Sequence, residues 1–129
     1  MVLCWSCSKG GPPGNDDNHN YPDPNDYTVP VLVVNTPTDN QVFTNGSSIN
    51  VTGNISDNSL FQGSITIQNN TTGAIVKDQY YEIHYIPSYN FSLSYVATVM
   101  ASTDYTVTVR FEDHGHNVAS KSIIVTVNP

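Results

Sequence analysis

The chain has 129 residues, a length that suits one ordinary domain and is too short for two domains with separate cores. Eleven acidic residues against four Lys and Arg give a net charge of −7, and only 12% of the residues are charged. This low charge, together with 38% hydrophobic residues, excludes a disordered acidic tail. The lack of a basic patch excludes nucleic acid as a partner. No apolar run reaches the roughly 18 residues of a membrane-spanning helix.

Residues 1–28 are expected to lie outside the folded domain, because a short apolar stub is followed by a stretch rich in Gly, Pro, Asn and Asp. Cys4 and Cys7 form a Cys-x-x-Cys pair without the second ligand pair or βαβ context that zinc or redox chemistry needs. A small residue, Ser6, then Cys7-Ser8-Lys9-Gly10 and an acidic tether resemble the start of mature lipoproteins of Bacteroidota. The resemblance implies a lipid on Cys7, although the usual charged leader is missing. The alternative is a disordered tail with inert thiols.

From Val29 onward, apolar and polar residues alternate with the period of two that is typical of half-buried strands. In the clearest case, Tyr105, Val107, Val109 and Phe111 point to one face of a strand. No segment has the apolar stripe of an amphipathic helix. The pattern predicts seven strands, at about 29–35, 48–56, 60–69, 74–86, 89–97, 103–112 and 118–127.

Seven short strands within about 100 residues predict an all-β fold, an antiparallel immunoglobulin-like β-sandwich. Tyr105, at the head of the sixth strand, matches the tyrosine corner of such folds. The inward positions of the second and sixth strands are aliphatic or aromatic, so no disulfide joins them. We therefore expect apolar burial alone to stabilise the core.

Residues 30–127 resemble the bacterial Ig-like domains of cell-surface proteins, and in particular the small Ig-like surface lipoproteins of Bacteroidota. The resemblance is carried by Asn35-Thr36-Pro37, by Ile49–Asp57 and by the closing segment Tyr105–Asn117. It implies an Ig-like domain over 29–129, preceded by the tether. These motifs define a fold and do not define an activity.

Catalysis finds little support in the sequence. No Ser lies in a Gly-x-Ser-x-Gly elbow, no Gly-rich loop suits a phosphate, and no spacing singles out a pair of carboxylates. We therefore expect a protein that is not an enzyme and that requires no cofactor.

One group of residues is a candidate metal site, because alternate loops of an Ig-like sandwich meet at one pole. The group consists of Asp57, His84, Asp113, His114 and His116. Mixed His and carboxylate ligands suit zinc, and an oxygen-rich subset suits calcium. The competing interpretation is ordinary turn composition, in which Asp and Asn cap turns and the histidines are plain surface residues.

The sequence thus predicts a non-catalytic binding or scaffolding domain, exported and lipid-anchored at the outer membrane or cell surface. Its partner would be a protein or a glycan. One alternative is a carbohydrate-binding accessory module, for which Tyr80 and Tyr89 are the freest aromatic candidates. The other alternative is a metal-binding surface protein.

Overall fold

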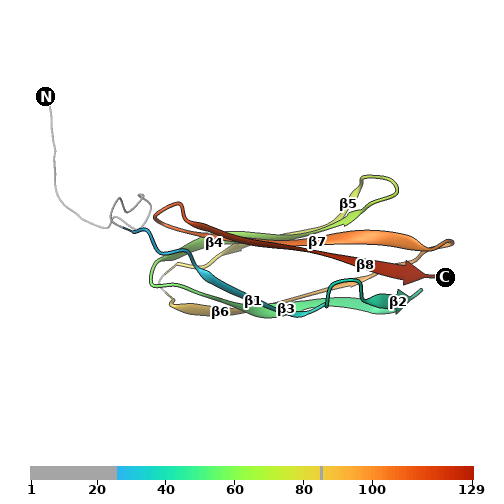
Figure 1. Cartoon of the computed structure of the whole chain (residues 1–129), viewed down its shortest axis with the longest axis horizontal. Coiled ribbons are helices and arrows are strands. Elements are labelled where there is room, and N and C mark those ends of the chain that lie inside the picture. The colour runs from blue at the N-terminus through green and yellow to red at the C-terminus, as the bar shows by residue number, and fades with distance from the viewer. Residues whose placement is uncertain (1–25, 85) are drawn as a thin grey trace, which may run out of the picture.

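The computed structural model describes residues 26–84 and 86–129, so Cys4, Cys7 and the rest of residues 1–25 lie outside it. The described chain is all β, with strands connected by turns and without a helix (Figure 1). The eight strands are β1 (Val31–Thr36), β2 (Val42–Thr44), β3 (Ser48–Ser56), β4 (Leu60–Asn69), β5 (Ile75–Glu82), β6 (Ser88–Val96), β7 (Thr103–Asp113) and β8 (Val118–Asn128). Over these residues there is accordingly no helix of the length and hydropathy that crossing a bilayer would need.

The strands form two layers, a three-stranded sheet in the order β1-β3-β6 and a five-stranded sheet in the order β2-β8-β7-β4-β5 (Figure 1). All neighbours are antiparallel except β2 and β8, which are parallel. With β3 and β6 in one sheet and β4, β7 and β8 in the other, the strand order is that of an immunoglobulin-like sandwich. The predicted fold class is confirmed.

The structure refines the predicted strands in two places. The short strand β2 was not expected, so the sandwich has eight strands where seven were predicted. The strand predicted over 74–86 ends at Glu82, because the chain then leaves the five-stranded sheet and enters β6 of the other sheet. Strands β3 and β4 coincide with the predictions 48–56 and 60–69.

The core lies between the sheets and is built from the inward positions of the alternating strands. Along β7, Tyr105, Val107, Val109 and Phe111 are buried, as predicted. The largest fully buried side chains are Phe91, Phe111, Ile49, Ile55, Leu60, Ile65, Ile67, Ile123, Val51, Val107, Val109 and Val125.

Two phenylalanines meet across the core, each seated on a glycine of the neighbouring strand. Phe91 of β6 is paired with Gly53 of β3, and Phe111 of β7 is paired with Gly63 of β4. The two rings are stacked, with centroids 5.5 Å apart. A Cβ atom at Gly63 would lie 2.5 Å from Cε1 of Phe111, and one at Gly53 would lie 2.5 Å from Cζ of Phe91. The missing side chains are therefore what lets the rings occupy the space between the sheets.

We predict that Gly63→Ala destabilises the fold by about 1–3 kcal/mol, because the new methyl group overpacks the Phe111 ring. The neighbouring outward substitution Ser64→Ala should change the free energy of unfolding by less than about 0.5 kcal/mol. Chemical denaturation of the two variants measures the difference. Equal effects would mean that the ring does not need the space above Gly63.

Candidate functional site

Three loops at one end of the sandwich lie together with the start of the described chain, and we call this end the entry pole. It consists of residues 26–30, the β3–β4 loop (57–59), the β5–β6 loop (83, 84, 86 and 87) and the β7–β8 loop (114–117). The backbone N–H of Asp57 donates to the carbonyl of Pro87 (3.0 Å), which joins the β3–β4 and β5–β6 loops. The N–H of His114 donates to the carbonyl of Ser59 (3.0 Å), which joins the β7–β8 loop to the β3–β4 loop. These bonds hold the three loops together.

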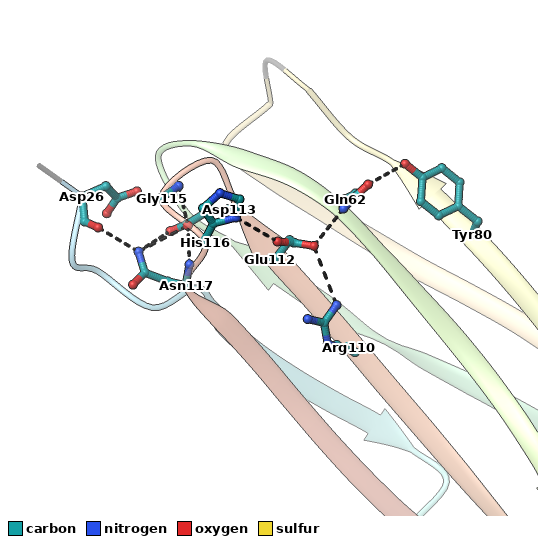
Figure 2. A network of polar contacts seen from close by, with 9 residues as sticks. All are labelled: Asp26, Gln62, Tyr80, Arg110, Glu112, Asp113, Gly115, His116 and Asn117. Carbon is teal, nitrogen blue, oxygen red and sulfur yellow. Dashed lines mark hydrogen bonds and ion pairs between the residues drawn. The ribbon is translucent and has the colours of Figure 1, made fainter. Parts of the chain in front are cut away.

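Asp113, the last residue of β7, is the one buried charged side chain among the described residues, with 0% of its surface exposed. Its Oδ1 accepts hydrogen bonds from the backbone N–H groups of Gly115 and Asn117, each at 2.9 Å. The side-chain amide of Asn117 donates to both carboxylate oxygens, at 3.1 and 3.2 Å (Figure 2). His116 takes a positive φ of 64° in this turn, a conformation in which glycine is more usual. Asp113 therefore organises the β7–β8 loop.

Two further aspartates lie beside Asp113. Ser59 links them, because its hydroxyl donates to Asp26 (2.7 Å) and its backbone N–H donates to Asp57 (2.9 Å). One carboxylate oxygen from each of Asp26, Asp57 and Asp113 lies within 4.8 Å of the others. Three segments far apart in sequence thus bring three carboxyl groups to one point.

The pKa values of two of these carboxyl groups are shifted in opposite directions. Burial raises the pKa of Asp113 above its ordinary value of 3.8; hydrogen bonds from Asn117 work against this shift, and the neighbouring Asp26 adds to it. The pKa of Asp26 is lowered, chiefly by the hydrogen bond from Ser59 and also by those from Thr28 and Asp113. Asp113 therefore keeps its proton to a higher pH than Asp26 does.

His84 and His114 form a separate pair at the same pole. Nδ1 of His84 lies 3.2 Å from Nε2 of His114, and Nε2 of His84 lies 2.9 Å from Oε2 of Glu82. The ring of Phe61 stacks on His114 with centroids 4.6 Å apart and lies 5.2 Å from His84. Only 13% of the His84 side chain is exposed, so it is not the plain surface residue of the competing interpretation.

A chain of polar contacts crosses the outer face of the five-stranded sheet next to this pole (Figure 2). The hydroxyl of Tyr80 on β5 donates to Gln62 on β4 (2.8 Å), and the amide of Gln62 donates to Glu112 on β7 (2.8 Å). Glu112 also lies 3.7 Å from Arg110 and 3.6 Å from His116. The strand register brings these side chains together, and no sequence motif marks them.

The predicted metal residues are thus distributed over three places. Asp57 and Asp113 lie together with Asp26, His84 lies with His114, and His116 lies beside Glu112. Sequence reasoning missed Asp26, which lies in the segment assigned to the tether. The side-chain amide of Asn117 donates to the backbone carbonyl of Asp26 (3.0 Å). Contacts with the domain therefore begin before residue 29.

No protein-family model matches the chain, and no curated protein matches it. Among solved structures, a CARDB domain from Pyrococcus furiosus, described in complex with di-metal ions, is 11% identical with a TM-score of 0.42, over 88% of this chain and all of that one. Murine CRIg is 13% identical with a TM-score of 0.44, over 78% of this chain and 98% of that one.

A third similar structure, an engineered protein, is 15% identical with a TM-score of 0.48, and the match covers 78% of this chain and only 20% of that one. Fibronectin(III)-like modules of Clostridium thermocellum CbhA are 13% identical with a TM-score of 0.41, over 78% of this chain and 46% of that one. Each of these TM-scores is below 0.5. The immunoglobulin-like fold is therefore assigned from the strand order of this chain.

The raised pKa of Asp113 predicts a specific pH dependence of stability. Its protonated form favours the folded state, so this contribution is complete below pH 3.8 and is lost as the pH rises through the raised value. In Asp113→Asn, the amide oxygen still accepts from the backbone N–H groups of Gly115 and Asn117, and the neutral amide has no charge to bury. We therefore predict that Asp113→Asn gains stability relative to the wild type as the pH rises toward neutrality.

Urea unfolding at a series of pH values measures this difference. Asp78→Asn, an exposed substitution on β5, is the control and should follow the wild type. A difference between Asp113→Asn and the wild type that stays constant with pH would contradict the raised pKa of Asp113.

Proposed function

We propose that this protein is an exported, non-catalytic binding or scaffolding module, held at the outer membrane or cell surface by a lipid on Cys7. The observation that carries the proposal is the fixed entry of the chain into the sandwich. Asp26 is bonded through its carboxylate to Ser59 and through its carbonyl to Asn117, so an anchor that precedes it would hold the domain by the entry pole. Both outer sheet faces and the opposite pole would then be presented to partners.

The length of the connecting segment supports this arrangement. Eighteen residues lie between Cys7 and Asp26. An extended chain of that length spans at most about 60 Å, which is longer than the headgroup layer is thick. The segment is rich in Pro, Gly, Asn and Asp, a composition that suits a spacer between a membrane and a domain.

The polar groups of the entry pole support a binding role over a catalytic one. The buried carboxyl of Asp113 is engaged by the backbone of its own loop, and Asp57 caps its own turn through the N–H of Ser59. Carboxylates that accept hydrogen bonds from the backbone of their own loops stabilise those loops. Function then depends on the surface that the loops and sheets present to a protein or glycan partner.

The carbohydrate-binding alternative now depends on Tyr80 alone. Tyr80 is 55% exposed on the outer face of the five-stranded sheet, beside Gln62 and Glu112. Tyr89 lies in the other sheet and packs against Tyr81, with ring centroids 5.6 Å apart. The two tyrosines therefore do not form the shared platform that a sugar chain would stack on, and a glycan array comparing wild type with Tyr80→Ala tests what remains.

The anchor is tested by mass spectrometry of the native protein extracted from membranes. We predict an intact mass that corresponds to a chain beginning at Cys7 with added lipid. Cys7→Ser should release the protein from the membrane fraction, because one lipidated residue supplies the attachment. Cys4→Ser is the matched control and should leave the protein in place. A soluble protein that retains residues 1–6 would contradict the proposal.

A second candidate function, binding of a divalent cation, is favoured by the convergence of Asp26, Asp57 and Asp113 within 4.8 Å. Carboxylate oxygens are the ligands that calcium prefers, and a cation would relieve the repulsion between the ionised carboxylates. Zinc would instead draw on the histidines His84, His114 and His116.

Thermal unfolding with calcium, zinc and a chelator separates these cases. We predict that calcium raises the melting temperature at neutral pH by mass action, that Asp57→Asn loses the shift and that Asp78→Asn keeps it. A zinc-specific shift that disappears below about pH 6.5 would assign the site to the histidines. No shift with any divalent cation would contradict this second candidate.

A further inference from the structure

The charges of this acidic protein are unevenly divided between its two sheets. The strands of the three-stranded sheet, β1, β3 and β6, contain no Asp, Glu, Lys, Arg or His. All charged residues that lie in strands are in β5, β7 and β8 of the other sheet. The chain as a whole carries a net charge of −7. One sheet of the sandwich is therefore a surface that a second acidic molecule can approach without meeting like charges.

The outer face of this sheet is covered by small or amide side chains that bond to one another. The Asn54 amide donates to Ser88 and to Asn90, each at 2.8 Å. Ser94 donates to Asn50 (2.7 Å). Val31 and Val33, at 60% and 47% exposure, extend the uncharged face onto β1. These contacts run from strand to strand across the sheet and order the side chains up to its edge at β6.

Sheet edges usually carry devices that prevent pairing with another chain, such as charges, proline, bulges or short length. Three of the edges in the described part of this chain carry such devices. Strand β5 has Lys77, Asp78 and Glu82, β2 has only three residues, and β1 has a register shift between Val34 and Thr36 and is flanked by Pro30 and Pro37.

The open side of β8 beyond β2 is also covered, because the backbone of Ile124 bonds to Asn40 (2.7 Å) and to the Asp39 carboxylate (3.2 Å). Strand β6 is the exception. Its nine residues pair with β3 one for one, without a register shift, and include no charge, proline or glycine. On its other side no strand of residues 26–84 or 86–129 lies next to it.

We propose that β6 is a homodimerisation edge, on which β6 of a second copy pairs antiparallel about a two-fold axis. An antiparallel strand is its own complement, because each copy offers the same row of unpaired N–H and C=O groups. The dimer would contain a continuous six-stranded sheet, β1-β3-β6 followed by the partner's β6-β3-β1. The strands of this sheet would bring no charged side chain to the new strand pair.

The side chains of β6 suit this partner. Ser88, Asn90, Ser92 and Ser94 are exposed and small enough to face their counterparts across a two-fold axis. Tyr89 and Tyr95 point inward and are only half-buried at the edge, so a second strand would cover apolar surface that the single domain leaves exposed. The pairing thus combines backbone hydrogen bonds with burial of two tyrosines from each copy.

Sedimentation analysis of the full chain over a range of concentrations tests the proposal. We expect a species of twice the chain mass of 14.1 kDa. Ser92 is the middle residue of β6, is exposed and makes no side-chain hydrogen bond among the described residues. Ser92→Lys places like charges near each other across the axis and should raise the concentration for half-association by about fivefold or more.

Ser120→Lys is the matched control, because Ser120 is an exposed serine on the outer face of β8 and the substitution changes the net charge equally. It should leave association unchanged. A wild type that is monomeric at every concentration would overturn the proposal. So would a dimer that Ser92→Lys leaves intact, or one that both substitutions weaken equally.

Hydrogen exchange on the wild type gives a measurement that needs no variant. Backbone amides of β6 should become more protected as the protein concentration rises, and those of β5, the charged edge, should not. A dimer in which the amides of β6 exchange at the same rate as in the monomer would place the interface elsewhere and overturn the assignment.

Discussion

The stack of Phe91 on Phe111 is the interaction on which the rest of this structure depends. It joins β6 of one sheet to β7 of the other, and it does so because Gly53 and Gly63 leave room for the rings. Two residues after Phe111, the same inward face of β7 presents Asp113, so the position of the ring also fixes where the buried carboxyl enters the loops. Core packing and the geometry of the entry pole are therefore consequences of the same strand.

Most of the fold was predictable because alternation is a strong signal in strands with one buried face. Strand β7 shows this in its series of inward residues from Tyr105 to Phe111. Strand β2 was not predictable, because three residues are too few for a period of two. It exists because Asn40 and Gln41 bond to β8 and draw Val42–Thr44 alongside it. Such a strand is decided by tertiary contacts, which a single sequence does not display.

The candidate site was predictable only in part. Asp57 and Asp113 were found because the topology brings their loops to one pole. Asp26 was missed because its surroundings have the composition of a tether, and only the bonds to Ser59 and Asn117 reveal its role. The chain of contacts from Tyr80 through Gln62 to Glu112 depends on register between three strands. Local sequence carries no information on that register until the strands are paired.

A double-mutant cycle on Phe91 and Phe111 tests the central claim most directly. Each phenylalanine is replaced by leucine, singly and together, and the free energy of unfolding is measured for all four proteins. If the stacked rings join the sheets, the two substitutions are coupled by about 0.5–1.5 kcal/mol beyond their separate costs. Strict additivity would mean that the sheets are held together by general apolar burial and would contradict the account.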